Sequence, residues 1–143
     1  MLVRCLYASR PLASSRGDDD LARILEQSRR NNPARGLTGL LCVSENLFIQ
    51  VLEGGRDEVC DLFNAIICDP RHQHVRLLSY EEIPQRMFGS WAMGQVSINK
   101  LNPGLVLKYF RHMELDPFDV SGQTTLSLLG ELMATGAILN RAE

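Results

Sequence analysis

The sequence predicts an α+β domain of the ferredoxin-like type, a βαββαββ sandwich with further helices after the last strand. Two amphipathic stretches with helical spacing are separated by short apolar runs that are rich in β-branched and aromatic residues, which is the pattern of crossover helices between strands. Two of these runs follow one another closely, which indicates a hairpin in the middle. The 143 residues, 45% hydrophobic and 22% charged, suit one globular domain with an ordinary core.

The first strand is expected at residues 2–8, LVRCLYA, and a turn-rich polar stretch follows it. The first helix is expected at about residues 18–30, where acidic residues at the start and arginines at the end complement the helix dipole. Its apolar face is formed by Leu21, Ile24 and Leu25. Asn31, Asn32 and Pro33 are expected to end this helix, because the residue before a proline avoids the helical region.

The hairpin is expected from residues 37–43, LTGLLCV, and residues 46–54, NLFIQVLEG, joined by a short polar connection. The second of these strands is apolar on both faces, so we expect it to be central and covered. A second helix follows at about residues 56–68, with an apolar stripe made by Val59, Leu62, Phe63, Ile66 and Ile67.

The last two strands are expected at residues 75–83, VRLLSYEEI, and residues 90–98, SWAMGQVSI. Two C-terminal helices are expected to cover the face of the sheet that the first two helices leave open. One runs from Pro103 to about Met113, and the other is capped by Ser121 and has Leu126, Leu129 and Met133 on one stripe.

Composition argues against several classes of protein. The net charge is −2 and basic residues form no long run, so neither nucleic acid nor a membrane surface is an expected partner. No apolar stretch approaches the roughly 20 residues of a membrane span. Four cysteines occur without a CxxC motif or zinc-ligand spacing, which indicates a reduced, cytoplasmic protein without a structural metal.

One polar residue stands out in the third strand, because Gln50 shares its face with Phe48 and Leu52. A buried amide without a partner costs roughly 1–3 kcal/mol. Tyr7 lies on the neighbouring central strand, where its phenol would donate to the amide oxygen and leave the amide NH2 free. A flat heterocycle between the two helices would accept from that NH2. Its walls would be Ile24 and Leu25 on one side and Phe63 or Ile66 on the other.

Five separated segments carry a resemblance to a known family: LVRCLYAS, RRNNPARGLTG, NLFIQVLEGG, DPRH and FGSWAMG. In this order and at these spacings, the chain resembles the BLUF family of flavin-using blue-light sensors over about residues 2–97. The resemblance implies FAD, or FMN in its place, held without a covalent bond between the two helices. It further implies a short, stand-alone sensor with a flavin-binding domain at residues 1–98 and a C-terminal helical extension at residues 99–143 packed on the sheet.

The resemblance also implies roles for individual residues. Tyr7 and Gln50 become the photochemical pair, and Asn32 the residue at the flavin edge, with Asn31 as its polar neighbour. Arg71 and His72 fall on the phosphate or ribityl side, and Ser9 matches a small polar residue near the tyrosine. Together with the wall residues, the expected flavin contacts are Ser9, Ile24, Asn31, Asn32, Phe48, Gln50, Arg71 and His72. Trp91 and Met93 match the signalling residues, and we expect both on one face of the fifth strand.

The implied activity is that of a switch and not of a turnover enzyme. After blue-light excitation, Tyr7 gives an electron, a proton moves by way of Gln50, and the rearranged amide is sensed by the fifth strand and the C-terminal helices. No output segment is recognisable, so the signal is expected to pass to an unknown protein partner or through a homo-oligomer built on the terminal helices.

Two other functions are compatible with the same fold. Acylphosphatase-type hydrolases pair an arginine with an asparagine, a role that Arg71 and Asn32 would fill, although the glycine-rich phosphate cradle is missing. A plain ligand-binding or dimerisation module would use the same residues structurally. In that case Trp91 and Met93 are core side chains, because both types commonly fill a core.

Overall fold

The computed structural model describes residues 1–12 and 17–135, without the side chains of residues 17–22, 24, 25 and 29. Its centre is one five-stranded sheet with the strand order β4-β1-β3-β2-β5. The strands are β1 (Leu2–Pro11), β2 (Thr38–Val43), β3 (Phe48–Gly55), β4 (His72–Ile83) and β5 (Gly94–Ser97). Neighbouring strands are antiparallel except β2 and β5, which run parallel. The predicted β2–β3 hairpin and the central position of β1 and β3 are therefore confirmed.

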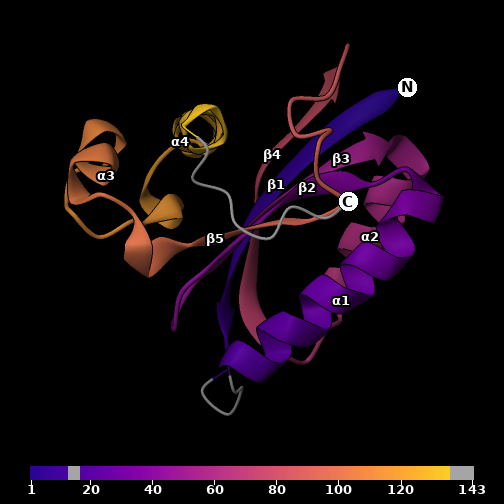
Figure 1. The fold of residues 1–143 in the computed structure, drawn as a ribbon, viewed down its shortest axis with the longest axis horizontal. Helices are drawn as coiled ribbons and strands as arrows, with labels where there is room; N and C mark the ends of the chain where they lie inside the picture. The colour runs from indigo at the N-terminus through magenta and orange to yellow at the C-terminus, as the bar shows by residue number, and fades with distance from the viewer. Residues whose placement is uncertain (13–16, 136–143) are drawn as a thin grey trace.

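Helices cover both faces of this sheet (Figure 1). The helices α1 (Gly17–Arg35) and α2 (Arg56–Ile67) lie on one face. The other face carries α3 (Pro103–Tyr109) and α4 (Gly122–Ala134). Along the chain, the short 3-10 turn η1 (Ile98–Lys100) precedes α3, and η2 (Pro117–Asp119) lies between α3 and α4. This is the predicted α+β sandwich, with the C-terminal helices opposite the crossover helices.

Each face of the sheet has its own buried apolar cluster. The cluster under α2 contains Val3, Cys5, Leu37, Leu41, Leu52, Val59 and Met93. The larger cluster under the C-terminal helices includes Leu6, Ile49, Val51, Phe88, Trp91, Leu126, Leu128, Leu129 and Leu132. Burial on both faces explains why β3 is a continuous apolar run and does not alternate, as expected for a doubly covered strand.

The end of α1 differs from the prediction, because the helix continues past Asn31 and Asn32 to Arg35 with Pro33 inside its last turn. Gly36 ends it instead, at a left-handed φ of 68°. The N–H of Leu37 donates to the oxygen of Asn32 at 2.9 Å and that of Gly36 to the oxygen of Pro33 at 3.2 Å, which is the Schellman arrangement. Pro33 supplies no backbone N–H to this last turn, and Asn32 lies within the helix.

The fifth strand is also shorter than expected, since β5 begins only at Gly94. Trp91 and Met93 therefore precede the strand, and the expectation that they share a face of it is wrong. Met93 belongs to the cluster under α2, whereas Trp91 belongs to the cluster under the C-terminal helices. The apolar alternation of residues 90–98 imitates a strand that the backbone does not form over its first half.

Other bounds differ in detail. The central strand β1 and the edge strand β4 are both longer than predicted, and His72 is the first residue of β4. The helix α3 ends at Tyr109, and Met113 beyond it is exposed. Ser121 caps α4 as predicted, because its side chain accepts from the N–H of Thr124. In the described part of the chain, no helix is both long and apolar enough to cross a bilayer.

Candidate functional site

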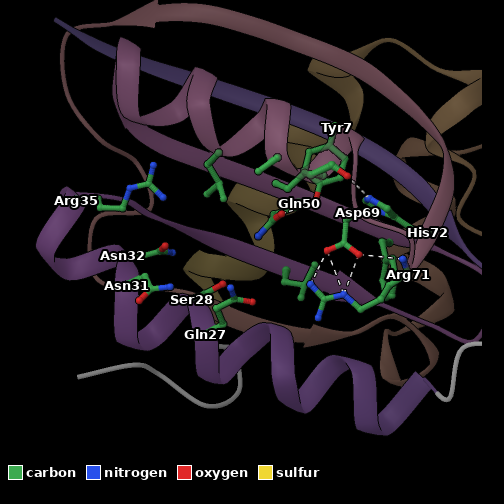
Figure 2. Close-up of a pocket in the computed structure, with 15 residues that line it drawn as sticks. Tyr7, Gln27, Ser28, Asn31, Asn32, Arg35, Gln50, Asp69, Arg71 and His72 are labelled. Carbon is green, nitrogen blue, oxygen red and sulfur yellow. Dashed lines mark hydrogen bonds and ion pairs between the residues drawn. The ribbon is translucent and has the colours of Figure 1, made fainter.

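A cavity of about 230 Å³ lies between α1 and α2, above the central strands. Its lining comes from both helices, the two central strands, β2, the α2–β4 connection and the start of β4: Tyr7, Gln27, Ser28, Asn31, Asn32, Arg35, Leu41, Phe48, Gln50, Leu62, Ala65, Ile66, Asp69, Arg71 and His72. Polar side chains of α1 face Tyr7 and Gln50 across this space (Figure 2). The predicted slot between the two helices is therefore present in the fold.

Tyr7 and Gln50 form the buried wall of the cavity. They are directly opposite one another in the β1–β3 ladder, and the Tyr7 hydroxyl donates to Oε1 of Gln50. Burial, and next the nearby Cys5 thiol, raises the pKa of Tyr7 far above its ordinary value. The phenol therefore keeps its proton at any physiological pH, and the pairing inferred from sequence is present.

The other end of the Gln50 amide has a weak partner. Nε2 of Gln50 lies 3.4 Å from Sδ of Met93, and a thioether sulfur is a poor acceptor. Gln50 is only 4% exposed, and it lines the cavity. A buried NH2 group in this condition favours a ligand atom that accepts a hydrogen bond.

Ser9 and His72 support the tyrosine from the side. The His72 ring lies 6.3 Å from the Tyr7 ring and 6.2 Å from the Phe48 ring, measured between centroids. Its Nε2 donates to the oxygen of Ile66 at 2.7 Å, because a carbonyl only accepts. In the neutral ring Nδ1 then accepts from Oγ of buried Ser9, also at 2.7 Å. Ser9 thus fixes His72 and does not itself line the cavity.

Asn31 and Asn32 both line the cavity from the last turns of α1. Asn32 is 2% exposed, and its Nδ2 donates to the backbone oxygen of Ala92 at 2.8 Å. Asn31 is exposed at the rim. The expected order of the two is therefore consistent with their placement: Asn32 is inside and Asn31 is its outer neighbour.

Arg71 lies at the cavity but is paired with Asp69, an acidic residue that the sequence reasoning missed. Its guanidinium contacts the Asp69 carboxylate, with Nη2 2.5 Å from Oδ2 and Nε 2.9 Å from Oδ1 (Figure 2). This pairing lowers the pKa of Asp69. The positive charge of Arg71 is therefore partly compensated at the place where an anionic tail was expected.

The remaining wall residues divide into expected and missed ones. Phe48 and Ile66 line the cavity as expected, and Phe63 packs on the Tyr7 ring at 5.6 Å between centroids. The side chain of Ile24 lies outside the described residues. The missed residues are Gln27, Ser28, Arg35, Leu41, Leu62, Ala65 and Asp69. The recurrence of polar residues at 28, 31, 32 and 35 is a helical stripe and is the signal that would have found the α1 members.

Met93 and Trp91 have opposite environments. Met93 is fully buried beside Gln50, on the cavity side of the sheet. Trp91 is buried on the other side, and among the described residues its Nε1 is one of two buried side-chain polar atoms without a hydrogen-bond partner. Only Met93 therefore touches the photochemical candidates.

The donor set fits a flavin. The cavity has apolar and aromatic walls and a few convergent amides, the usual composition of a cofactor site. Its volume is below the roughly 300–1,000 Å³ of pockets that enclose a drug-sized ligand. A cavity of this size suits a flat ring system.

Comparisons with known proteins agree with this chemistry. A family model described as sensors of blue light using FAD (BLUF) matches residues 2–94. The chain is 33% identical over 87 residues to photoactivated adenylate cyclase subunit beta of Euglena gracilis, covering 60% of this chain and 10% of that protein. It is 32% identical over 96 residues to the blue light- and temperature-regulated antirepressor BluF of Escherichia coli (strain K12), covering 65% and 23%. The matched region spans about a tenth of the first relative and under a quarter of the second.

Solved structures match over nearly the whole chain. The photo-activated state of BlsA superposes with a TM-score of 0.84 at 28% identity, covering 100% of this chain and 99% of that one. The dark-state structure of the BLUF protein BlrB superposes with a TM-score of 0.78 at 32% identity, covering 94% and 96%. The similarity therefore includes the C-terminal helices as well as the sheet.

Proposed function

The chain belongs to the BLUF family of flavin-binding blue-light sensors, and we propose that Tyr7 and Gln50 are the residues with which it detects light. The family senses light and is not a family of turnover enzymes. The observation that carries the proposal is the buried hydrogen bond from the Tyr7 hydroxyl to Oε1 of Gln50 at the cavity wall. The hydrolase alternative is not favoured, because Arg71 is engaged with Asp69 and Asn32 with the backbone of Ala92.

The proposed cofactor is FAD, with FMN as the second candidate. The family description names FAD, whereas one structural neighbour, BlrP1 of Klebsiella pneumoniae, was solved with FMN. Both flavins share the ring system, and they differ in the adenylate group that only FAD carries. The residues proposed to hold the ring are Ile24, Asn31, Asn32 and Phe48, with His72, fixed by Ser9, and Arg71 at the rim.

The proposed mechanism uses the protons and dipoles of the wall. A bound flavin would supply the absorption of blue light and the electron acceptor, and Tyr7 is the proposed electron donor. Tyr7 holds a proton in the dark, because burial raises its pKa, and it is hydrogen-bonded to Gln50 in readiness for transfer. Gln50 relays that proton, and its amide is left with a new hydrogen-bond arrangement. The amide loses only a weak hydrogen bond when it rearranges, because the partner of Nε2 is the Met93 sulfur.

Signalling is proposed to begin at Met93, the residue that contacts Gln50 directly. Trp91 is proposed to respond through the apolar cluster on the opposite side of the sheet. Residues 1–98 are proposed to form the flavin-binding unit, and residues 99–143 an extension that reads its state. The shared cluster of sheet and α4 side chains supports this division, because the extension buries its apolar face on the sheet.

The output is proposed to pass to a separate protein in the cytoplasm or through a change in a homo-oligomer. The names of the relatives connect such domains with adenylate cyclases and with an antirepressor. In this chain the C-terminal helices are the proposed contact, because Leu107 and Met113 near α3 remain exposed.

The test is the colour and light response of the purified full chain. We expect a yellow protein from which denaturation releases FAD and whose absorption shifts to the red after blue light and returns in the dark. Release of FMN alone would change the cofactor and leave the function intact. A colourless protein that takes up neither FAD nor FMN would overturn the proposal in favour of a plain binding module.

A further inference from the structure

Glu53 of β3 is a fully buried carboxylate on the side of the sheet away from the cavity, and it has no part in the proposed photochemistry. Its Oε1 accepts from the backbone N–H of Phe88 at 2.7 Å. Its Oε2 accepts from the N–H of Met87 at 3.0 Å and from Nε of Arg4 at 2.7 Å. A buried charge persists only when it is paired and hydrogen-bonded, and all three donors here converge on one group.

The backbone that Glu53 holds belongs to the 86–93 segment, the stretch between β4 and β5 that ends in Met93. This segment meets both of the amides proposed to face the flavin. Nδ2 of Asn32 donates to the oxygen of Ala92 at 2.8 Å, and Nε2 of Gln50 lies 3.4 Å from Sδ of Met93. One end of the segment therefore touches the cavity residues, and the other end is bound to Glu53.

The same carboxylate is connected to β4 through Arg4. Nη1 of Arg4 donates to Oε1 of Glu81 at 2.8 Å, and Oε2 of Glu81 accepts from Nε2 of Gln123 at 3.4 Å. Gln123 lies in the first turn of α4. Arg4 is 8% exposed and Glu53 is fully buried, so their ion pair is only weakly screened by water, whereas the Glu81 side chain is 35% exposed.

The first turn of α4 also rests directly on β4. A Cβ atom on Gly122 would lie 2.4 Å from the oxygen of Leu78 and 2.9 Å from Cβ of Ser79, so the helix start and the strand are in backbone contact. No side chain of Gly122 separates the helix from β4, so a displacement of the strand at this point would act directly on the helix backbone. Close packing of this kind transmits small shifts and does not damp them.

We propose that Glu53 is a positioning residue: it anchors the 86–93 segment and, through Arg4 and Glu81, ties the position of that segment to the first turn of α4. In the dark the anchor holds Met93 against Gln50. When Gln50 rearranges, the segment pulls on the Glu53 carboxylate, and the ion pairs carry the change to β4 and α4. The light-driven part rests on the proposed function, whereas the anchoring part does not.

The first arm of the test measures amide hydrogen exchange in the dark on the full chain. Glu53→Gln keeps the shape of the side chain but removes its charge. We expect the amides of Met87 and Phe88 to exchange about tenfold faster or more, the scale of losing a charge-assisted hydrogen bond. Glu82→Gln is the matched control, since Glu82 is an exposed β4 carboxylate paired with Arg56, and it should leave both rates unchanged. Wild-type rates in Glu53→Gln would overturn the anchoring role.

The second arm compares light and dark on the flavin-loaded chain. Glu81→Leu removes the contacts of β4 with Arg4 and with Gln123 of α4 but leaves the Glu53 anchor in place, and it replaces a partly exposed side chain, so we expect it to disturb folding less than Glu53→Gln. We expect it to keep the red shift and the protection of Met87 and Phe88, but to lose the light-induced exchange change in the first turn of α4. The proposed link to α4 would be overturned if Glu81→Leu showed the full light-induced exchange change in the first turn of α4. It would also be overturned if a wild type with a normal red shift showed no such change.

The two proposals fail in different ways. Absence of the red shift in the flavin-loaded wild type would count against the proposed function, and the dark arm would still decide whether Glu53 anchors the segment. A normal red shift with an unaltered α4 would count against the link alone.

Discussion

The hydrogen bond between Tyr7 and Gln50 joins two polar side chains in a part of the sheet where an ordinary core has none. Sequence reasoning found both, because an amide inside an apolar run is costly and needs a partner on the neighbouring strand. It did not find Asp69, because nothing in the sequence distinguishes this residue from an ordinary carboxylate after a helix. Asp69 and Arg71 are two residues apart in the sequence, and the fold places this ion pair at the cavity.

At this scale the first prediction concerns Gln50. Gln50→Leu is close in volume but neither accepts from Tyr7 nor relays a proton, so we expect flavin to bind and the light-induced red shift to vanish. The orphaned Tyr7 hydroxyl should also lower the free energy of unfolding by about 1–3 kcal/mol. Difference absorption spectra and urea unfolding measure the two effects.

Gln73→Leu is the control, because this β4 amide is exposed and lies outside the cavity. It should leave both the shift and the stability near wild type. A normal red shift in Gln50→Leu would remove Gln50 from the proton path.

Among the elements, the C-terminal end of α1 differs from the prediction because of its local sequence. Pro33 was expected to stop the helix, but the structure places it in the last turn and gives the termination to Gly36. The two backbone bonds to Asn32 and Pro33 close the helix, and the bond to Asn32 holds the residue proposed for the flavin edge. A proline indicates that a helix ends nearby, but it does not give the residue at which the helix ends.

Gly36→Ala tests this termination. A Cβ atom at Gly36 meets only ordinary contact, 3.8 Å from Nη2 of Arg86, so the cost is that of the left-handed φ alone. We expect a loss of about 1–2 kcal/mol in the free energy of unfolding and weaker flavin binding through Asn32. Gly89→Ala is the control, since its Cβ would be 3.4 Å from a side-chain atom and its φ is ordinary. Equal stability of the two variants would contradict the account.

The 86–93 segment shows where periodicity misleads. The alternation of apolar residues from position 90 onward predicts a strand with Trp91 and Met93 on one face, but β5 begins only at Gly94. Instead, the N–H of Gly39 donates to the oxygen of Trp91 and Nδ2 of Asn32 donates to that of Ala92, so side-chain and isolated backbone bonds replace a ladder. Such long-range bonds have no local sequence signal.

For the whole molecule, the architecture follows closely from the apolar pattern. A strand that is apolar on both faces requires two covering layers, and the C-terminal helices supply the second. The fold class, the hairpin and the position of the C-terminal helices were therefore predictable. The anchor at Glu53 was not, because the segment it binds is 34 residues away in sequence and is recognised through its backbone.

Alkaline pH should destabilise the molecule as a whole. Burial raises the pKa of the Cys42 thiol from 9.0 to about 12, and burial followed by the Cys60 charge does the same for Cys5. Between about pH 9 and 12 the unfolded chain has therefore released protons that the native state keeps. Stability falls as pH rises there, by about 1.4 kcal/mol per pH unit for each thiol.

Urea unfolding at several pH values between 8 and 11 measures this slope. Cys42→Ala should reduce the slope by one thiol's contribution, whereas Cys68→Ser, at an exposed position, should not change it. An identical slope in wild type and Cys42→Ala would show that the Cys42 thiol ionises alike in both states.

The central claim is that the Tyr7 hydroxyl and the Gln50 amide convert light into a change of hydrogen bonding. The most direct measurement is the absorption difference spectrum of flavin-loaded wild type and Tyr7→Phe before and after blue light. We expect a reversible red shift in the wild type and none in Tyr7→Phe at equal flavin content. An equal shift in both proteins, or none in the flavin-loaded wild type, would contradict the account.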